Sequence, residues 1–430
     1  MSSSMVPTVV DVLVVGAGLS GLRAALTVQA AGLSCAAIEA TDRVEGKTLT
    51  VSSKLSDPGV NDVGAAWIND TSQSEMYKLL RRYGLQGEFQ IVKGQDIYLH
   101  PDGAMMSPHG ELLVSRNDKA VLSEAFISIR RLILNTNLKD PVSSLGGKEL
   151  DQLTLQDYCI RTFQSEFITE VFNTISQSLL GLDSDEISML SFVHYCKSGT
   201  GIDALISDGK DEAQYLRLRQ GAQSFSTNMA KELITEIKQS PTSGLYTVVS
   251  KRGRLFSGKK VILTNASPLY PTIRFDPPLP ESKQRLAKKN MLGYYSKIIF
   301  ILIRRARDGP ILFCVHTSIT DDAQWSISCF MVGQRGRKWS QLSETDRRRS
   351  AWEQLCTAFR NYFHGGPCPV APPGLLSSID GSASRTPFGS VHFVDTETAL
   401  EWKGYMERAV RSGDRGASEV ITALQWESKF

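Results

Sequence analysis

The opening stretch of the chain constrains its fold most, because two apolar runs, a glycine-rich turn and a helical segment follow one another in a fixed order. The apolar run at residues 11–15 (DVLVV) leads directly into residues 16–21 (GAGLSG), and a helix-like segment then extends to Ala31. A second apolar run ends at Glu39, an acid 18 residues after the last glycine of the turn. This GxGxxG arrangement predicts a βαβ unit of an α/β domain that binds a dinucleotide.

Each residue of this turn has a physical task in such a unit. Gly16 permits the tight turn, Gly18 lets a pyrophosphate approach the backbone, and Gly21 lets helix and strand pack closely. The helix N-terminus offers N–H groups and a positive dipole end to phosphates, and Glu39 is expected to accept hydrogen bonds from a ribose diol. We expect an ADP-containing dinucleotide here; a glycine-rich turn without a ligand is the alternative.

Length and composition place the chain among globular proteins. Its 430 residues suffice for two domains, and 41% hydrophobic and 22% charged residues are typical of a soluble fold. The net charge of +3 is too small to suggest a nucleic acid or an anionic membrane as partner. No run of 18 apolar residues occurs, so we expect no membrane association, while the oligomeric state stays open.

The cysteines point to a reducing compartment. Seven are scattered along the chain without a CxxC pair, which favours reduced thiols in an intracellular protein and argues against a metal site. The C-terminal residues 428–430 (SKF) resemble the peroxisomal address Ser-Lys-Leu but differ in the last residue. Cytoplasmic and peroxisomal locations therefore both remain open.

The remaining pattern is that of alternating helical and strand segments. The middle of the chain to about residue 204 is expected to be mostly helical, and apolar runs predict strands at 246–250, 259–264, 296–303, 324–332 and 390–394. A long helix with one apolar face begins near Met406. The chain thus ends as it begins, and we expect its last unit to return to the first domain and complete the cofactor site.

Three segments carry a family resemblance. Residues 39–48 (EATDRVEGKT) resemble the EA-x-DR-x-GG-[RK]-T segment of flavin-containing amine oxidases, and residues 62–67 (DVGAAW) resemble their D-x-G-x-x-W. Residues 396–407 (TETALEWKGYME) resemble the closing GTET…W-x-GYME segment. The similarity covers essentially the whole chain and looks closest to the fungal monoamine oxidases of the N type.

The resemblance implies a two-domain FAD-dependent amine oxidase fold. A Rossmann-like FAD-binding domain would comprise residues 1–75, 205–290 and 380–430, and a mixed α+β substrate-binding domain would comprise 76–204 and 291–379. FAD would be bound without a covalent link. The implied reaction oxidises an amine carbon–nitrogen bond to an imine, which hydrolyses to a carbonyl, while O₂ is reduced to H₂O₂. The amine would be a simple one or an alkaloid of secondary metabolism.

The motifs also imply site residues, which are matched position by position. The implied catalytic residues are Lys297, which in the family holds a water at flavin N5, and Tyr405, one of two aromatic residues that flank the amine. A lysine on an apolar strand could instead face solvent at a sheet edge, and the tyrosine could be a core residue. The implied cofactor-binding residues are Gly16, Ala17, Gly18, Gly21, Glu39, Ala40, Arg43, Lys47, Gly64, Ala65, Ala66, Trp67, Thr396, Glu397, Tyr405 and Met406.

Several positions depart from the family pattern. Glu45 and Asp395 replace glycines near the expected pyrophosphate, where a carboxylate is repulsive by roughly 1 kcal/mol or more, and Arg408 replaces a third glycine. The position expected for the second aromatic residue holds none, although Tyr362 or Phe363 could substitute. These departures leave open a degenerate relative with weak or no flavin binding and a non-catalytic role. The glycine fingerprint taken alone also leaves open an NAD(P)-type dehydrogenase.

Overall fold

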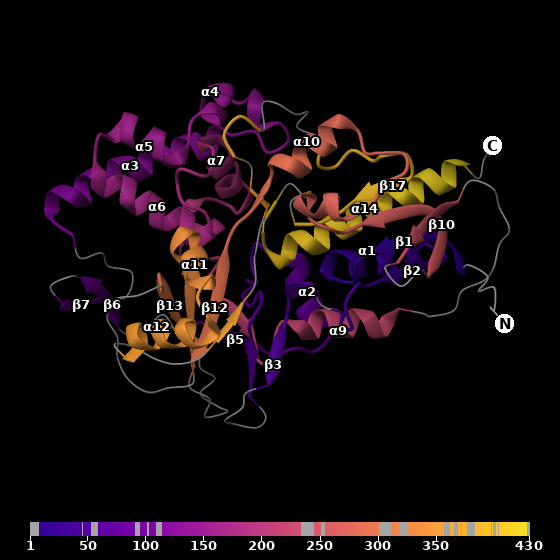
Figure 1. Cartoon of the computed structure of the whole chain (residues 1–430), viewed down its shortest axis with the longest axis horizontal. Coiled ribbons are helices and arrows are strands. Elements are labelled where there is room, and N and C mark those ends of the chain that lie inside the picture. Colours follow the sequence, from indigo (N-terminus) through magenta and orange to yellow (C-terminus); the bar gives the residue numbers. More distant parts are fainter. Residues whose placement is uncertain are drawn as a thin grey trace.

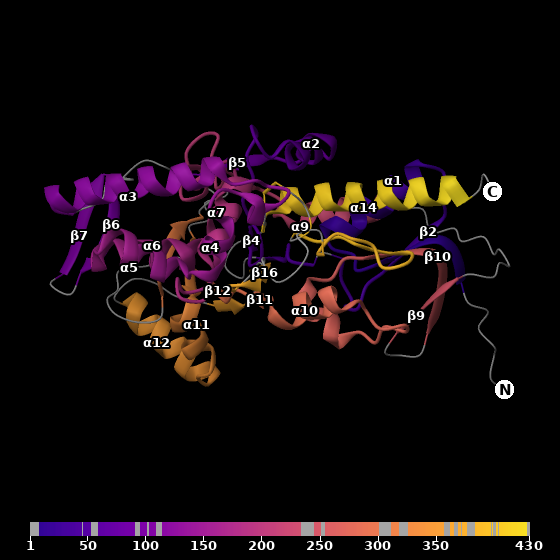
Figure 2. The same cartoon turned by 90° about the horizontal axis from the view of Figure 1, so that it is seen from above.

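The fold has a parallel sheet at one end and a helical region with a second sheet at the other (Figures 1 and 2). The first and last described elements, β1 (Thr8–Val15) and α14 (Met406–Glu427), both lie at the end with the parallel sheet (Figure 1). The computed structural model describes residues 8–44, 46–52, 59–90, 95–100, 103–108, 114–233, 245–250, 254–300, 311–317, 326–356, 362–364, 369–370, 372–375, 383–396, 398, 401–402 and 404–427.

The parallel sheet is assembled from three separated parts of the chain. β1 (Thr8–Val15) pairs in parallel with β2 (Cys35–Ile38) on one side and β10 (Leu255–Leu263) on the other. β17 (Val391–Phe393) extends the sheet in parallel with β10, and β9 (Tyr246–Val249) pairs antiparallel with β10. The strands predicted from the apolar runs of these regions are therefore confirmed.

The first and last helices cover this sheet together. α1 (Leu19–Ala30) and α14 (Met406–Glu427) lie side by side in both views (Figures 1 and 2). A Cβ at Gly413 would lie 2.3 Å from a backbone carbonyl of α1, so the glycine allows the close approach. The Asp414 carboxylate accepts a hydrogen bond of 2.8 Å from Arg23 Nε. The closing unit does return to the first domain, as the sequence predicts.

The second sheet is antiparallel and holds the predicted lysine on an inner strand. Its strand order is β13-β14-β12-β15 within the described residues. The strands are β12 (Tyr295–Phe300), β13 (Phe313–His316), β14 (Ile327–Val332) and β15 (Tyr362–His364). The helices α11 (Gly333–Ser340) and α12 (Glu344–Cys356) lie close to it in Figure 1.

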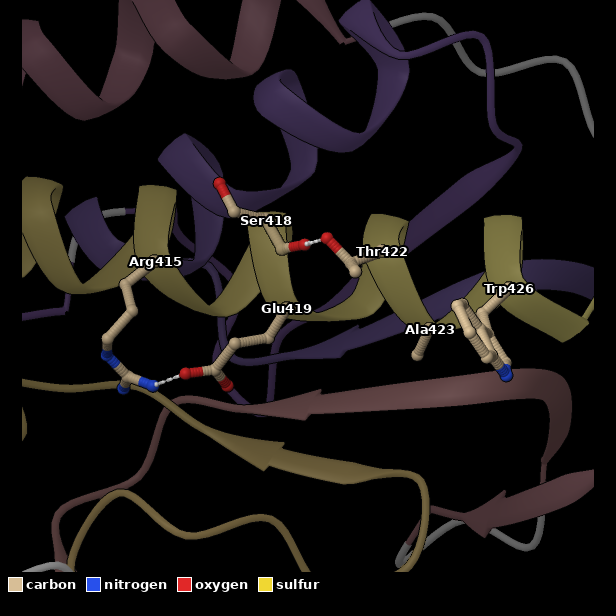
Figure 3. A pocket seen from close by; sticks show the side chains of 6 residues that line it. All are labelled: Arg415, Ser418, Glu419, Thr422, Ala423 and Trp426. Atoms are coloured by element: carbon tan, nitrogen blue, oxygen red, sulfur yellow. Dashed lines mark hydrogen bonds and ion pairs between the residues drawn. The ribbon is translucent and has the colours of Figure 1, made fainter.

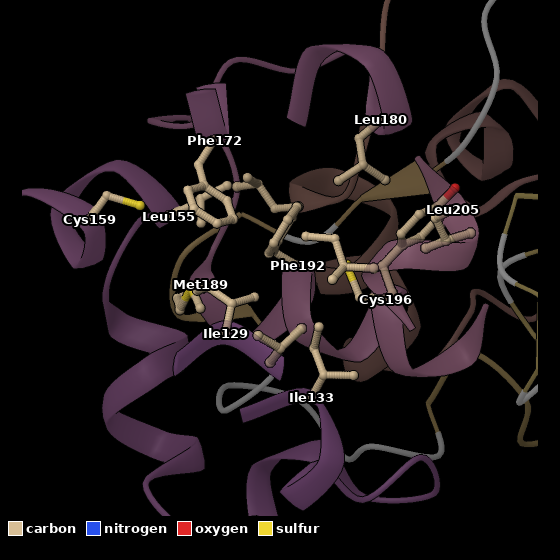
Figure 4. Close-up of a cluster of buried hydrophobic side chains, with 14 of the residues drawn as sticks. Ile129, Ile133, Leu155, Cys159, Phe172, Leu180, Met189, Phe192, Cys196 and Leu205 are labelled. Atoms are coloured by element: carbon tan, nitrogen blue, oxygen red, sulfur yellow. The ribbon is translucent and has the colours of Figure 1, made fainter. Parts of the chain in front are cut away.

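The middle of the chain forms a helical region around one apolar cluster, which includes Phe172 and Phe192 with ring centroids 6.4 Å apart (Figure 4). Its helices are α3 (Arg116–Asn135), α4 (Gly147–Gln152), α5 (Leu155–Phe163), α6 (Glu166–Leu180), α7 (Met189–Ser198) and α8 (Ile202–Leu205). Outside this region lie α2 (Ser74–Arg82), α9 (Gln223–Glu232) and α10 (Glu281–Lys289).

Short strand pairs interrupt the helical pattern that the sequence predicts. β6 (Gln95–His100) and β7 (Gly103–Pro108) form a hairpin in the region expected to be helical. β5 (Gly87–Phe89) pairs with β8 (Leu216–Leu218), which joins two segments assigned above to different domains. β3 (Thr50–Ser52) pairs with β4 (Val60–Asp62). The exact domain boundaries stay a prediction.

Within the described part of the chain, none of the helices has the length and apolar character that crossing a membrane requires.

Candidate active site

The glycine-rich turn is fixed by close packing at two of its three glycines. Gly16 has a φ of +105°, and a Cβ there would lie 2.0 Å from Thr264 Oγ1. A Cβ on Gly21 would lie 2.0 Å from the Gly16 carbonyl oxygen. At Gly18 the nearest atom to an added Cβ is Gly46 Cα at 3.6 Å, so no close packing requires this glycine. Its small size instead keeps the backbone open where a ligand would approach.

The start of α1 is suited to an anion. Gly18 is its N-cap and provides no side-chain cap, and the first turn contains no acidic residue. The Glu39 carboxylate, at the end of β2, accepts hydrogen bonds from the backbone N–H groups of Ala17 (2.8 Å), Ala40 (2.9 Å) and Thr41 (3.0 Å). Partial burial raises the Glu39 pKa, but these hydrogen bonds lower it more, so the net pKa lies below its ordinary value. Glu39 thus stays ionised and fixes the turn; its contact with a ribose stays a prediction.

Three parallel strands end together beside this turn. The backbone N–H of Thr264 donates to the Val15 carbonyl (3.0 Å), which aligns the ends of β1 and β10. Beyond β17, Asp395 and Thr396 are each 7% exposed. Asp395 Oδ2 and Thr396 Oγ1 have no hydrogen-bond partner among the described residues. Buried polar atoms are rarely left unpaired, so the edge where a pyrophosphate is expected carries unused hydrogen-bonding capacity.

The start of α14 meets the glycine-rich turn. Met406 is 4% exposed and belongs to the same apolar cluster as Ala17 and Leu19. Tyr405, which is partly buried, lies edge-on to Trp402 with ring centroids 5.2 Å apart. The structure therefore brings Met406 to the opening βαβ unit, whereas Tyr405 packs against the apolar cluster of the helical region.

Glu407 is a structural residue that sequence reasoning did not single out. Its side chain is fully buried and accepts hydrogen bonds from the backbone N–H groups of Glu75 (3.1 Å) and Met76 (2.7 Å) at the start of α2. Arg411 Nε donates a third, of 2.6 Å. Burial raises the Glu407 pKa, and these partners offset only part of that effect. Glu407 is the last residue of the GYME motif, and this was the sequence signal that could have identified it.

The second glycine-rich segment packs against the residues that follow the arginine motif. A Cβ at Gly64 would lie 2.2 Å from the Lys47 carbonyl oxygen, which accepts a hydrogen bond of 2.9 Å from the Ala65 N–H. Ala66 is buried at 3% exposure, whereas the side chains of Arg43 and Lys47 are exposed. The backbone of this segment, rather than its side chains, is what the packing fixes.

Lys297 is buried against this segment. Its side chain is 6% exposed, and Nζ donates to the carbonyl oxygens of Asp62 (2.6 Å) and Gly64 (3.0 Å). The ammonium also lies 5.0 Å from the ring centroid of Trp67 and 5.6 Å from that of Phe330. Burial lowers the Lys297 pKa to about 8, although Asp62 works in the opposite direction. The alternative of a solvent-facing edge lysine is therefore excluded.

Two charged residues that sequence reasoning did not assign to the site are the partly buried Asp62 and the buried Arg217. Asp62 Oδ1 accepts hydrogen bonds from Thr50 Oγ1 (2.5 Å) and the Ala222 N–H (2.8 Å). Burial raises the Asp62 pKa, and Thr50 and Lys297 counter part of that rise. Arg217, 7% exposed, donates to a backbone carbonyl over 2.9 Å, and burial lowers its pKa. Both charges act on the titration of Lys297.

Some predicted positions lie outside the described residues. These are Glu45, Glu397, the loop at 365–368 and the C-terminal residues 428–430. Arg408 is described and is 1% exposed. The register of β15 pairs Phe363 with Lys297 and Tyr362 with Ile298.

A surface hollow of about 690 Å³ lies along the second half of α14 (Figure 3). Arg415 and Glu419, on its wall, form an ion pair of 2.5 Å, and Glu419 also contacts His392 Nδ1 at 3.0 Å. Trp426 lines its far end and is 65% exposed. Because its charges neutralise one another and it includes none of the motif residues, this hollow is not the candidate active site.

Comparison with known proteins gives a consistent family. A family model described as flavin containing amine oxidoreductase matches residues 19–421. A flavin-containing amine oxidase of Danio rerio is 26% identical over 459 aligned positions, covering 96% of this chain and 86% of the relative. The chain therefore belongs to the flavin-containing amine oxidoreductases, and it is an enzyme that oxidises amines.

Solved structures agree with this fold. Cyclohexylamine oxidase from Brevibacterium oxydans IH-35A superposes with a TM-score of 0.85 at 26% identity, covering 97% of this chain and all (100%) of that one. Putrescine oxidase bound to putrescine superposes with a TM-score of 0.86 at 22% identity, again covering 97% of this chain and 100% of the other. The two-domain FAD amine oxidase fold is thus confirmed.

The residues present fit the FAD that this family implies. Gly18 leaves the turn open, the start of α1 carries no competing acid, and Thr396 Oγ1 offers an unused hydrogen-bonding group at the same sheet edge. The Asp395 carboxylate is the one described feature that opposes an anionic ligand there. Within the described residues, no group of three His, Cys, Asp or Glu side chains is arranged to bind a metal.

Proposed function

We propose that this chain oxidises a small amine at an FAD held between the glycine-rich turn and the start of α14. Gly16, Gly18, Gly21 and Glu39 would position the ADP half, and Thr396 would contribute a hydrogen bond near the pyrophosphate. When bound, FAD supplies the acceptor for a hydride equivalent from the amine α-carbon, and O₂ takes up the electrons to give H₂O₂. The remaining chemistry is positioning and proton control by the chain itself.

The observation that carries this proposal is the buried Lys297. An ammonium so deeply buried is costly, and a purely structural position would be filled more cheaply by an apolar residue. Its hydrogen bonds to the Asp62 and Gly64 carbonyls hold it beside the Trp67 ring. A pKa of about 8 leaves the group able to hold a proton or to release it near neutral pH. We assign Lys297 the role of ordering a water at the reacting face.

Two aromatic positions support an amine between π faces. Tyr405 lies edge-on to Trp402 just before α14, and the register of β12 and β15 pairs Phe363 with Lys297. We propose this pair as the residues that flank the amine, with Phe363 in preference to Tyr362, which is paired with Ile298. The substrates named for the similar structures, cyclohexylamine and putrescine, favour a simple aliphatic primary amine. An alkaloid substrate, a fungal N-type ancestry, non-covalent FAD and a cytoplasmic or peroxisomal location stay predictions.

A second candidate is a relative with weak flavin binding. Asp395 favours it, because a buried carboxylate oxygen without a partner lies where phosphate oxygens would approach. The visible spectrum separates the two candidates. Protein purified with added FAD and then desalted should retain absorbance near about 450 nm. It should also release H₂O₂ with at least one member of a panel of primary amines.

Controls make the assay specific to the site. Lys297→Met should keep bound flavin but lower the rate of peroxide release by about a hundredfold, because the turn that binds FAD is untouched. Gly18→Val should lose the flavin itself, because a branched side chain would stand where the pyrophosphate approaches. Protein that is folded by circular dichroism yet colourless at saturating FAD would overturn the proposal. Equal rates for wild type and Lys297→Met would overturn the role of the lysine.

A further inference from the structure

Two cysteines face each other across neighbouring strands of the second sheet. Cys314 on β13 is paired directly with Cys329 on β14. The Thr317 N–H donates to the Ser326 carbonyl over 2.8 Å, which marks that pair as hydrogen-bonded. Because antiparallel ladders alternate, the cysteines three positions further along form a non-hydrogen-bonded pair, with Cα atoms about 4.5 Å apart. A disulfide spans Cα separations of about 4.4–6.8 Å, and the separation typical of such a pair lies within that range.

The two thiols differ in access. Cys314 is exposed, on the edge strand of the described sheet, whereas Cys329 has no exposed surface. The strand register places the two cysteines side by side, and both thiols are free in this structure. Burial and the neighbouring Cys314 raise the pKa of the Cys329 thiol well above its ordinary value. A small oxidant therefore reaches Cys314 first, and Cys329 is the neighbouring thiol that can react with the oxidised Cys314.

We propose that Cys314 and Cys329 form a peroxide-sensitive thiol pair that closes into a cross-strand disulfide. Hydrogen peroxide oxidises the Cys314 thiol to a sulfenic acid, and the O–O bond breaks with release of one water. The Cys329 sulfur then attacks the Cys314 sulfur, and the S–S bond forms as a second water leaves. In total, two thiols and one H₂O₂ give one disulfide and two waters. The oxidant is the product of the proposed amine oxidation, so this inference rests on that function for its source of peroxide.

The position of the pair protects the active site from the reaction. Successive residues of a strand point to opposite faces, so Cys329 and its neighbour Phe330 lie on different sides of β14. Phe330 faces the Lys297 ammonium and stacks on Phe313 with ring centroids 4.6 Å apart. The disulfide would therefore form behind this aromatic wall and leave the space in front of Lys297 open. Removing either thiol should leave amine oxidation within about twofold of wild type.

The other described cysteines provide internal controls. Cys35, Cys159 and Cys196 are buried, and the last two lie in the apolar cluster of the helical region (Figure 4). Burial raises the pKa of Cys35 to about 11 and that of Cys159 to about 12. Because all three thiols are buried, unlike the exposed Cys314, peroxide should leave them reduced while the fold is intact.

The experiment treats the whole protein with added H₂O₂ at pH 7.5 or without it, blocks free thiols with N-ethylmaleimide under denaturing conditions, and maps peptides by mass spectrometry. The expected product is one disulfide-linked peptide that joins Cys314 and Cys329. In Cys329→Ser, dimedone should instead trap a sulfenic acid at Cys314. The matched control Cys159→Ser should form the linkage as wild type does. The inference is overturned if both thiols are recovered alkylated, or if Cys314 links to another cysteine.

A second arm replaces added peroxide by an amine, with and without catalase. Linkage with the amine that catalase prevents supports both the thiol pair and its source of peroxide. Linkage with added peroxide but never with any amine supports the thiol pair and counts against the proposed amine oxidation. Failure of the thiol pair and failure of the proposed amine oxidation therefore give different results.

Discussion

Lys297 should leave a measurable trace in the pH dependence of stability. Its pKa is about 8 in the folded protein and about 10.5 as an ordinary lysine, so the folded state loses the proton first as the pH rises. Between these values the unfolded chain binds more protons, and the free energy of unfolding therefore increases with pH. The difference of about 2.5 in pKa corresponds to about 3 kcal/mol, most of which should be gained between pH 8 and about 10.

Two variants isolate this contribution. Lys297→Met and Lys297→Gln both remove the titrating group together with the ammonium that donates to the Asp62 and Gly64 carbonyls. That loss costs about 1–3 kcal/mol at every pH and should shift the curves vertically. The slope of the free energy of unfolding against pH differs between wild type and the variants, because only wild type gains stability from deprotonation of Lys297. Loss of the lysine also raises the Asp62 pKa, since Lys297 lowers it, and this change works in the same direction.

The assay is urea unfolding of wild type and both variants at pH 7, 8, 9 and 10. The difference between wild type and each variant should grow by about 2–3 kcal/mol across this range, with the same growth for methionine and glutamine. Apart from Asp62, the other titrating groups are shared by wild type and variants, and their contributions cancel to first order. Parallel curves would refute the argument, because they would mean that Lys297 keeps an ordinary pKa despite its burial.

Three further changes test other parts of the account. Asp395→Gly should bind FAD about fivefold more tightly, measured by quenching of flavin fluorescence, because roughly 1 kcal/mol of repulsion disappears; unchanged or weaker binding would contradict this. Gly21→Ala should lower the free energy of unfolding by about 2–3 kcal/mol, because the added Cβ would lie 2.0 Å from the Gly16 carbonyl oxygen. The control Gly32→Ala, whose Cβ would have nothing within 4 Å, should lower it by only about 1 kcal/mol. Equal losses for the two variants would argue against close packing at Gly21. Glu407→Gln should destabilise the protein by about 1–3 kcal/mol in urea, because it weakens the charged cap of α2, and wild-type stability would exclude that role.

The opening unit could be predicted from local rules. Local backbone conformation is fixed by the apolar run DVLVV, by the glycine spacing and by Gly32, which follows the end of α1 with a φ of +78°. The structure places β1, α1 and β2 within three residues of the predicted bounds. The return of α14 was also predictable, because its apolar face needs a partner and the family motif places it at the cofactor.

The charges around Lys297 could not be predicted in the same way. Asp62, Arg217 and Lys297 are far apart in sequence, and only tertiary packing brings them together. The β6–β7 hairpin escaped prediction because its short strands lack the alternation that separates a strand from a loop. The pairing of Cys314 with Cys329 depends on the register of β13 and β14, which composition does not determine.

The most direct test of the central claim is anaerobic mixing of the FAD-loaded protein with a primary amine in a stopped-flow spectrometer. The account predicts that the flavin absorbance near about 450 nm bleaches in wild type, and about a hundredfold more slowly in Lys297→Met, and that it returns in both when O₂ is admitted. Flavin that stays oxidised with every amine of the panel, in protein shown to bind FAD, would contradict it.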